Sequence, residues 1–547
     1  MRHTRFTVHG RPFLSLGAQA HNSSTYHLDD LARAYAAVHA LGGNTIAIPV
    51  AWDRFEAAEG QFDEAYVRDL ILRTRAEGLH LVLTWFGTWK NGTMEYVPGW
   101  VKGDPTRFPR VVCADGSVTA VLSSHYAATR EADRRAYCAL MQVIREADAG
   151  EQTVIAVQVQ NEAGILSGTR RDFGPAGQAD FASAVPSVLV EYARAHPATA
   201  LGREWTAAGA RETGTWSEVF GRYGAEAVTA WSIATYVEAI AAAGKDVYDL
   251  FTYTNAWSDG SPGWRYGWWT AGLDYPAGGP AVRNLDIWSV AAPSLDAICP
   301  DNYSPVEAAH AAAADAYVRE GYPLYVPESA AGNLNATWMF HALGNRDAIG
   351  YHVFAAESVV DDAGSLVESA QAMGRSMRMA VAVVPLLAEY AGTGRTYALL
   401  QHAGAEEAVV DVEGWKCRVG FGAALDGWMS RDYRHRPPAD VRAGLTDTAA
   451  EKGRGLLFQV DTNEFYLVGH YVRVMFAPED PMDGCIPILT ANPGMAVTNR
   501  GYLALTEGHF DDQGVYVIDR RRSGDEARHG VWADADCGVI HVVLDPA

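Results

Sequence analysis

The stretch Val157-Gln158-Val159-Gln160-Asn161-Glu162 decides how most of this sequence is interpreted. Apolar side chains run directly into the polar pair Asn161-Glu162, as expected where a buried strand ends at a functional edge. The segment Leu324-Tyr325-Val326-Pro327-Glu328 has the same form. Around these two stretches, short apolar runs alternate with amphipathic helical segments such as Leu28–Leu41, which stops at Gly42-Gly43. The alternation favours an α/β fold.

Helical segments of this kind separate eight strand candidates. The candidates end near Gln19, Val50, Trp85, Gln160, Asn255, Pro300, Pro327 and Phe354. Eight strands that alternate with helices predict a (β/α)8 TIM barrel, in which polar residues gather at the carboxyl ends of the strands. The stretch from Gly164 to about Ala230 is too long for a simple connection, so we expect inserted helices there, beside the site.

The sequence changes character after Ser365–Ala391, which we expect to be the last barrel helix. Closely spaced β-type runs follow without long helices: Leu456–Val460, Glu464–Val468, Tyr471–Met475, Ile486–Leu489 and Val515–Asp519. Such runs are typical of a β-sandwich or an open barrel. We therefore predict a barrel domain at residues 1–391 and a β-sandwich-like domain at residues 392–547.

The amino-acid composition and net charge indicate which kinds of molecule the protein binds. The 547 residues are 48% apolar and 20% charged, which is typical of a globular chain, and the formal net charge is −22. Such a charge repels phosphate backbones and anionic lipids on average, so we expect neither nucleic acid nor a membrane as partner. Sixteen Trp and 25 Tyr suit a ligand with an apolar face and a polar rim, such as a sugar, although a large core explains most of these rings.

Cysteine usage and the N-terminus point to a reducing compartment. The six cysteines form no CxxC pair, and we expect them to be buried free thiols. No His-Glu-x-x-His motif is present, so no metal site is expected. The first 20 residues loosely imitate a secretion signal, but His9-Gly10-Arg11-Pro12 interrupts a short apolar part, and a hairpin explains the segment better. The expected location is cytoplasmic.

The chemistry is carried by two glutamates. Glu162 and Glu328 end the fourth and seventh strand candidates, and across a closed barrel these ends meet at one mouth. Hydrolysis of a glycoside needs two carboxyl groups, one protonated to donate to the leaving oxygen and one ionised at the anomeric carbon. Either glutamate alone is more often a structural ion-pair partner. The two together favour the chemical interpretation.

The chain also resembles a known family. A fourth-strand glutamate preceded by Asn161 and a seventh-strand glutamate resemble the retaining glycosidases of the barrel clan that includes many β-galactosidases. Within that clan, Pro49–Glu56 followed by Glu59–Asp63 resembles the second-strand signature of glycoside hydrolase families 35 and 42. Trp85–Gly92 and Tyr96–Lys102 resemble the bacterial family 35 branch. The C-terminal domain of that branch is resembled by Asn463–Gly469, Glu507–Phe510 and Ser523–Glu526. One position departs from the pattern, since Gln160 stands where these enzymes usually have another Glu.

The resemblance implies roles for individual residues. Glu162 would be the general acid/base and Glu328 the nucleophile. Asn161 would bind the sugar 2-hydroxyl. Tyr303 would orient the nucleophile, although a core tyrosine bonded to backbone is the other interpretation. No metal or organic cofactor is implied.

Further contacts with the sugar are implied near other strand ends. Three tryptophans are candidates for a stacking wall, and each is equally well explained by packing: Trp52, Trp85 and Trp257. Lys90 and Asn91 are candidates for binding hydroxyls, whereas loop lysines are usually solvated. Glu357 would grip the non-reducing sugar or pair with an arginine.

The resulting prediction is an exo-acting, retaining β-galactosidase acting on oligosaccharides or glycosides. The nearest alternative is a retaining β-glycosidase of the same fold that acts on a fucoside, arabinoside or glucoside. A carbohydrate-binding protein without catalysis is the remaining alternative. The sequence leaves open the linkage, the aglycone, the oligomeric state, homo-oligomers included, and the role of the C-terminal domain.

Overall fold

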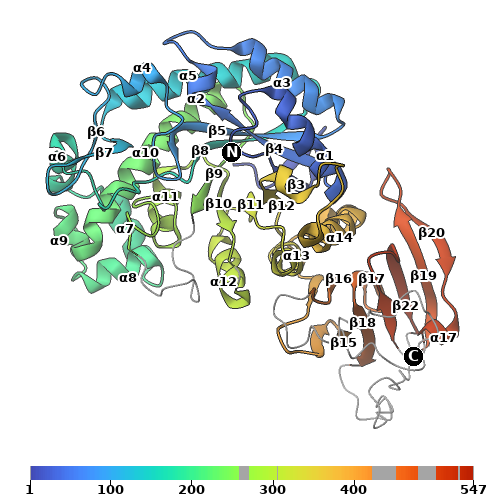
Figure 1. Cartoon of the computed structure of the whole chain (residues 1–547). Helices are drawn as coiled ribbons and strands as arrows, with labels where there is room; N and C mark the ends of the chain where they lie inside the picture. Colours follow the sequence, from blue (N-terminus) through green and yellow to red (C-terminus); the bar gives the residue numbers. More distant parts are fainter. Residues whose placement is uncertain are drawn as a thin grey trace.

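Eight parallel strands form a barrel in the computed structural model, which describes residues 2–257, 270–304, 306–421, 451–478, 501–527 and 530–545 (Figure 1). The strands are β3 (Ser15–Gln19), β4 (Thr45–Ala51), β5 (His80–Lys90), β8 (Val154–Asn161), β9 (Phe251–Trp257), β10 (Ala297–Asn302), β11 (Glu328–Ser329) and β12 (Gly350–Phe354). Their order is β11-β10-β9-β8-β5-β4-β3-β12. The predicted (β/α)8 barrel is confirmed.

The ends of this sheet meet beside β11. Val326 bridges in parallel to Tyr351, and its backbone N donates to the carbonyl of Gly350 at 3.2 Å. The predicted seventh strand, Pro323–Pro327, is only partly regular, because neither proline has an N–H to give to a ladder. The regular part begins one residue later, at Glu328.

Helices cover the outside of the barrel, as the alternating pattern predicts. The longer ones are α1 (Leu31–Leu41), α3 (Glu64–Ala76), α5 (Ala127–Asp148), α10 (Gly224–Val247), α11 (Leu285–Ala291), α12 (Glu307–Tyr317), α13 (Asn333–Phe340) and α14 (Gln371–Ala382). Helix α1 ends at Gly42, whose φ of 78° is left-handed, as the sequence indicates. The expected last helix is broken into α14 and α15 (Val384–Tyr390), because Pro385 is tolerated only in a first turn.

Inserted helices follow β8, as predicted. They are α6 (Pro175–Ala182), α7 (Ser187–Ala195), α8 (Ala200–Ala207) and α9 (Trp216–Phe220). By length and composition alone the segment Trp216–Val247 could cross a membrane, but most of it is buried inside the chain, as the core helices of many proteins are.

Short elements complete the barrel part. Strands β1 (Phe6–Val8) and β2 (Arg11–Phe13) pair as the expected N-terminal hairpin, and Phe6 packs among residues of β4, β5, β8 and β9. The others are α2 (Trp52–Phe55), α4 (Gly99–Lys102) and the hairpin of β6 (Arg110–Val112) and β7 (Val118–Leu122).

Two antiparallel sheets form the C-terminal part. One has the order β13-β16-β17-β22-β19-β20 and the other β14-β15-β18-β21. Their bounds are β13 (Thr396–Leu400), β14 (Glu407–Val412), β15 (Trp415–Phe421), β16 (Arg454–Asp461), β17 (Glu464–His470), β18 (Val472–Pro478), β19 (Tyr502–Phe510), β20 (Tyr516–Arg521), β21 (Val531–Ala533) and β22 (Val539–Leu544), with α17 (Gly524–Ala527) between β20 and β21. Both sheets contribute to one core, including Leu457, Phe476 and Ile540, as in a β-sandwich. The expected strand at Ile486–Leu489 lies outside the described residues.

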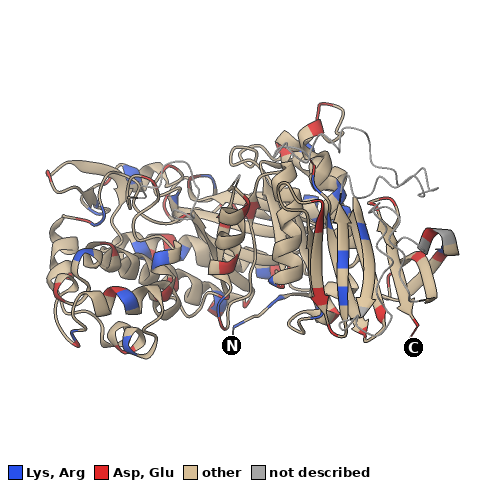
Figure 2. Cartoon of the chain, turned by 90° about the horizontal axis from the view of Figure 1, so that it is seen from below, with Lys and Arg blue, Asp and Glu red and all other residues tan. Residues whose placement is uncertain are grey.

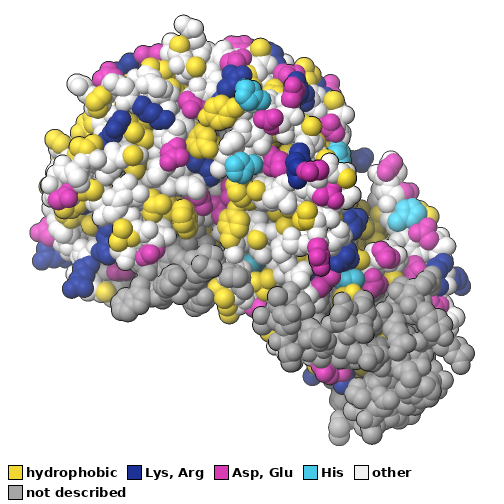
Figure 3. Space-filling view, in the orientation of Figure 1, with side chains coloured by type: hydrophobic (Ala, Val, Ile, Leu, Met, Phe, Trp, Pro, Cys, Tyr) yellow, Lys and Arg dark blue, Asp and Glu magenta, His cyan; other side chains and the backbone are white. Residues whose placement is uncertain are grey.

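The boundary predicted between residues 391 and 392 stays a prediction, because the two parts share packing. Leu456, Phe458 and Val468 belong to the same buried cluster as the barrel core. Figure 2 shows acidic and basic residues interspersed over both parts, and the face in Figure 3 also carries both signs.

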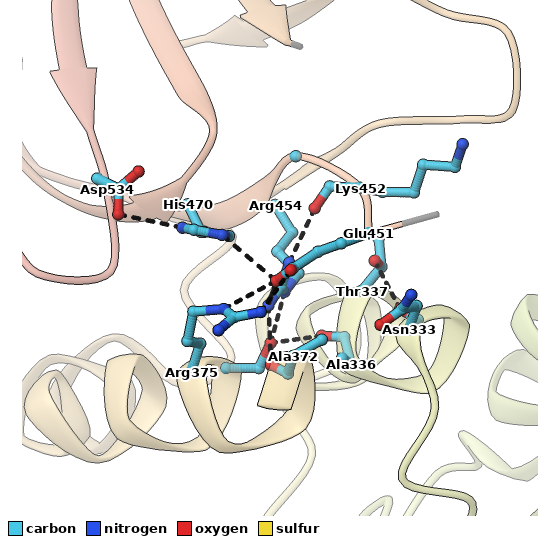
Figure 4. Close-up of polar contacts among 12 residues, drawn as sticks. Asn333, Ala336, Thr337, Ala372, Arg375, Glu451, Lys452, Arg454, His470 and Asp534 are labelled. Carbon is cyan, nitrogen blue, oxygen red and sulfur yellow. Dashed lines mark hydrogen bonds and ion pairs between the residues drawn. The ribbon is translucent and has the colours of Figure 1, made fainter. Parts of the chain in front are cut away.

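A buried ionic cluster joins α14 to β16 and β17 (Figure 4). Arg454 is fully buried and donates its Nε to Ser376 Oγ at 2.6 Å. Glu451 accepts from Arg375 Nε at 3.0 Å and from Arg454 Nη2 at 2.9 Å, and His470 Nε2 lies 3.3 Å from it. Burial alone would raise the pKa of Glu451, but the contact with His470, the charge of Arg454 and the hydrogen bond with Arg375 hold that pKa well below its usual range.

Candidate active site

A cavity of about 490 Å³ opens at the carboxyl ends of the barrel strands. Apart from Ala313 on α12, it is lined by residues at or just after the ends of β3, β5, β8, β9, β10, β11 and β12: His21, Asn22, Lys90, Asn91, Glu162, Trp257, Asp301, Asn302, Tyr303, Ser304, Glu328 and Phe354. The two glutamates singled out in the sequence therefore share one cavity.

Glu328 is held by donors from the end of β3 and from the residue after β10. Its Oε1 accepts from Gln19 Nε2 at 2.9 Å, and its Oε2 accepts from the Tyr303 hydroxyl at 2.7 Å. The side chain is nearly buried, with 4% of the residue exposed. One donor on each oxygen fixes the orientation of the carboxylate. Tyr303 contacts Glu328 as expected, whereas Gln19 is a partner that the sequence does not reveal.

Glu162 lies just beyond β8 in a strained conformation. Its φ is 45°, and its backbone N donates to Asn255 Oδ1 at 2.9 Å. Burial raises the pKa of its carboxyl to about 7; the charge of Lys90 and a hydrogen bond with Asp301 oppose the shift, and the charge of Glu328 adds to it. Near neutral pH this group is therefore suited to both donating and accepting a proton.

Asp301 adds a third carboxyl group, to which the sequence analysis assigns no role. It is the last but one residue of β10, lines the cavity and accepts from Asn255 Nδ2 at 2.7 Å. Burial and the negative charges of Glu328 and Glu162 raise its pKa well above the usual range. The sequence contains a pattern that could have identified Asp301, because this residue follows an apolar strand just as Glu162 does.

Asn161, Lys90 and Asn91 form a polar edge beside Glu162. Asn161 is fully buried and is not among the lining residues; its Nδ2 lies 3.3 Å from Asn91 Oδ1. Lys90 Nζ donates to the same oxygen at 2.5 Å. Lys90 and Asn91 both face the cavity. The predicted contacts of these three residues with a substrate stay predictions.

The structure corrects the predicted aromatic wall. Trp257 lines the cavity, but Trp52 and Trp85 are fully buried and do not. Their indole N–H groups donate to buried carboxylates, Trp52 to Glu56 at 2.7 Å and Trp85 to Asp133 at 2.8 Å. These two rings therefore pack among the core elements, and they cannot stack on a ligand in this cavity.

Glu357 lies beside the loop after β3, and its expected contact with a sugar stays a prediction. It does not line the cavity, and Arg33 donates to its backbone carbonyl instead of its carboxylate. The carboxylate accepts from the backbone N of His21 at 2.9 Å and from Ser24 Oγ at 2.6 Å. It therefore orders the loop after β3, which brings His21 and Asn22 to the cavity.

A buried network supports the residue before Asn161. Gln160 has a φ of 63° and donates its Nε2 to Asp133 Oδ2 at 2.7 Å. Asp133 lies on α5 and also accepts from Trp85 Nε1 and from Thr88 Oγ1 and backbone N. A Cβ on Gly87 would lie 2.4–2.8 Å from atoms of this network. Gln160 thus points into the network and does not line the cavity.

The thiols differ in part from expectation. Cys299, Cys417 and Cys537 are buried and free, whereas Cys113 and Cys138 are free but only partly buried. Cys485 lies outside the described residues. Among the residues that the structure describes, no group of three or more His, Cys, Asp or Glu side chains could hold a metal ion.

Comparison with families and curated proteins gives one match. Residues 373–534 match the family described as "Domain of unknown function (DUF5597)". The match begins within α14 and runs through most of the C-terminal sheets. Among curated proteins, none matches this sequence.

Several solved structures are similar to the chain. A β-galactosidase from the psychrophilic Marinomonas ef1 is 12% identical with a TM-score of 0.43, and one from Rahnella sp. R3 is 18% identical with a TM-score of 0.45. These alignments cover 69% and 71% of this chain but only 60% and 58% of those chains. The catalytic domain of a β-amylase from Paenibacillus polymyxa is 14% identical with a TM-score of 0.45, over 66% of this chain and 97% of that domain.

Proposed function

We propose that this chain is a retaining glycoside hydrolase, an exo-acting β-galactosidase, that works by double displacement. Glu328 attacks the anomeric carbon and forms a glycosyl ester while Glu162 gives its proton to the departing glycosidic oxygen. Water then attacks the anomeric carbon of the ester and gives its proton to Glu162, and the Glu328 carboxylate leaves. Every proton and bond in this cycle is supplied by the two glutamates, the glycoside and one water.

One observation carries the proposal: Glu162 and Glu328 face the same cavity from different strands, and their environments differ. Burial keeps Glu162 protonated up to about pH 7, as a general acid requires. Glu328 is gripped by Gln19 and Tyr303, as a nucleophile that must approach one carbon atom requires. When Glu328 becomes an ester its charge disappears, and the pKa of Glu162 falls, which suits its second role as base.

A β-galactoside is the proposed substrate, on the strength of the sequence resemblance. Trp257 offers the cavity an aromatic face, and Lys90, Asn91 and Asn302 offer it polar groups. These groups suit any neutral hexose, so a fucoside, arabinoside or glucoside is the nearest competing substrate. The free thiols support the further proposal of a reducing, cytoplasmic location.

The first experiment is hydrolysis of a panel of aryl β-glycosides. Glu328→Gln should abolish turnover of every glycoside, because no other group supplies the covalent intermediate. Glu162→Ala should spare substrates with good leaving groups and stop hydrolysis of disaccharides. Glu320→Gln, at an exposed position, is the matched control and should leave rates unchanged. Galactoside binding without hydrolysis by the unaltered chain would favour the carbohydrate-binding alternative.

Azide, a small anionic nucleophile, tests the two roles separately. In Glu328→Ala, azide can replace the lost carboxylate and attack a β-glycoside directly, which gives an α-glycosyl azide. In Glu162→Ala, azide can attack the glycosyl ester on Glu328, which gives a β-glycosyl azide. The assignment would be wrong if Glu328→Ala gave the β-glycosyl azide and Glu162→Ala gave the α-glycosyl azide. It would also be wrong if azide restored turnover in both variants and gave the same anomer in each.

A further inference from the structure

A second cavity, of about 220 Å³, lies among the helices near β5 and β8. It is bounded by the start of α5, by α6 and the turn after it, and by α9 and α10, and it shares no lining residue with the first cavity. From the end of β5 the chain passes through the β6–β7 hairpin into α5, so α5 begins near the carboxyl end of the barrel. Helix α10 also begins near that end, because it leads back to the start of β9. The cavity is therefore at the same end of the barrel as the first, on the flank away from the C-terminal sheets (Figure 1).

A hydrogen-bonded chain of side chains forms the polar wall. His125 Nδ1 lies 2.6 Å from Asp180 Oδ2 and 3.3 Å from Ser232 Oγ, and Ser232 Oγ is 2.7 Å from Ser124 Oγ. The His125 side chain is only 2% exposed. Within the described chain its Nε2 has no hydrogen-bond partner. Because Asp180 and Ser232 both contact Nδ1, Nε2 is left to accept a hydrogen bond from a ligand that enters the cavity.

This chain of residues is not a hydrolytic triad. In a triad the carboxylate contacts one ring nitrogen of the histidine and the serine contacts the other. Here Asp180 and Ser232 both contact Nδ1 of His125. Ser232 therefore cannot pass its proton to the ring nitrogen opposite the carboxylate. The arrangement suits binding and does not suit nucleophilic catalysis.

The cavity also has an aromatic lining residue, Trp231, and its charged lining residues are of opposite sign. Trp231 lies one turn from Val228 on α10, both line the cavity, and the indole is partly exposed. Trp231 packs against the buried core and stays partly exposed. Arg130 and Asp180 contribute opposite charges. A flat apolar face beside hydroxyls and offsetting charges suits a neutral polyhydroxy ring better than an ion.

We propose that this cavity binds one neutral sugar ring, which stacks on Trp231 and donates a hydroxyl hydrogen to His125 Nε2. Its volume is below the about 300 Å³ at which pockets for larger organic ligands begin, so it accommodates one ring and not an oligosaccharide. The proposal goes beyond the hydrolase function, because it requires neither Glu162 nor Glu328. A sugar held here lies at the same end of the barrel as the proposed active site.

The test uses the full chain carrying Glu328→Gln, so that no sugar is consumed. Methyl β-galactoside, methyl β-glucoside and methyl β-xyloside are titrated while the indole N–H signals are followed by NMR, the Trp231 signal being identified by its loss in Trp231→Phe. At least one glycoside should shift this signal saturably. His125→Ala should weaken that binding by about tenfold, as expected for loss of roughly 1.4 kcal/mol. His125→Gln, whose amide oxygen can accept the same hydrogen, should restore part of it.

Trp257→Ala is the matched control, because it removes the aromatic face of the first cavity only. It should leave the Trp231 titration unchanged. The proposal is wrong if no glycoside shifts the Trp231 signal, if Trp257→Ala abolishes the shift, or if sodium sulfate produces the same saturable shift, since that would indicate an anion site at Arg130. Failure of hydrolysis in the unaltered chain would contradict the proposed function and leave this result standing.

Discussion

Replacing Glu162 by Gln should make the protein more stable at alkaline pH, although it removes the proposed acid. The reason is that the folded chain holds this carboxyl in a site that disfavours its charge. A carboxyl whose pKa is raised by folding binds its proton more tightly in the folded state. The stability that it contributes is present below its unfolded pKa and is lost as the pH rises through its folded pKa. The glutamine side chain does not ionise, so it makes no such pH-dependent contribution.

The magnitude follows from the pKa values. The pKa of Glu162 rises from the ordinary 4.5 to about 7, and each unit corresponds to about 1.36 kcal/mol. The free energy of unfolding of Glu162→Gln, minus that of the unaltered chain, should therefore increase by about 3 kcal/mol between pH 4.5 and pH 7. Above that range the difference should stay constant, because Glu162 is ionised in both states.

Urea unfolding followed by tryptophan fluorescence at a series of pH values measures this difference. Glu320→Gln, at an exposed position, is the control for a charge lost from the surface, and its difference from the unaltered chain should vary little with pH. A difference for Glu162→Gln that is flat across the window, or that falls as the pH rises, would refute the reasoning. Such a result would mean that the cavity does not resist the charge of Glu162.

Three other substitutions test neighbouring contacts. Lys90→Met removes a positive charge that lowers the pKa of Glu162, so the alkaline limb of the kcat/KM profile should move to higher pH. Tyr303→Phe removes a hydrogen bond to Glu328, of a kind that contributes about 1.5–3 kcal/mol, and kcat on an aryl galactoside should fall by roughly 10- to 100-fold with a smaller change in KM. Arg454→Met leaves a buried ionic cluster without its central cation and should lower the free energy of unfolding by about 3–5 kcal/mol in urea titrations.

The barrel was predictable because its strands are buried on both faces. A strand of this kind is an uninterrupted apolar run, such as Val154–Val157, and it becomes polar only where it reaches the mouth. The shortened β11 was less predictable. Pro323 and Pro327 fit the apolar run, but the lack of their N–H groups decides which residues form a regular ladder.

The candidate site was predictable only in part, for a geometric reason. The closure of the barrel brings the ends of β8 and β11 together whatever the loops do, so Glu162 and Glu328 meet. The facing of a side chain near a strand end is decided by register, because neighbouring residues point to opposite sides of a sheet. Trp85, within β5, therefore packs away from the cavity, whereas Trp257, at the end of β9, lines it. Trp52 begins α2 and is buried, and the sequence does not distinguish these three rings.

The glutamine at position 160 is best understood through Asp133. The partners of the fully buried Asp133 in the described part of the chain are N–H and O–H donors, and the Gln160 amide supplies one of them at 2.7 Å. A Glu at this position would place a second carboxyl against Asp133, and one of the two would have to hold a proton. Since Gln160 is two residues from Glu162 and has a left-handed backbone, the uncharged amide links the α5 network to the position of the proposed acid.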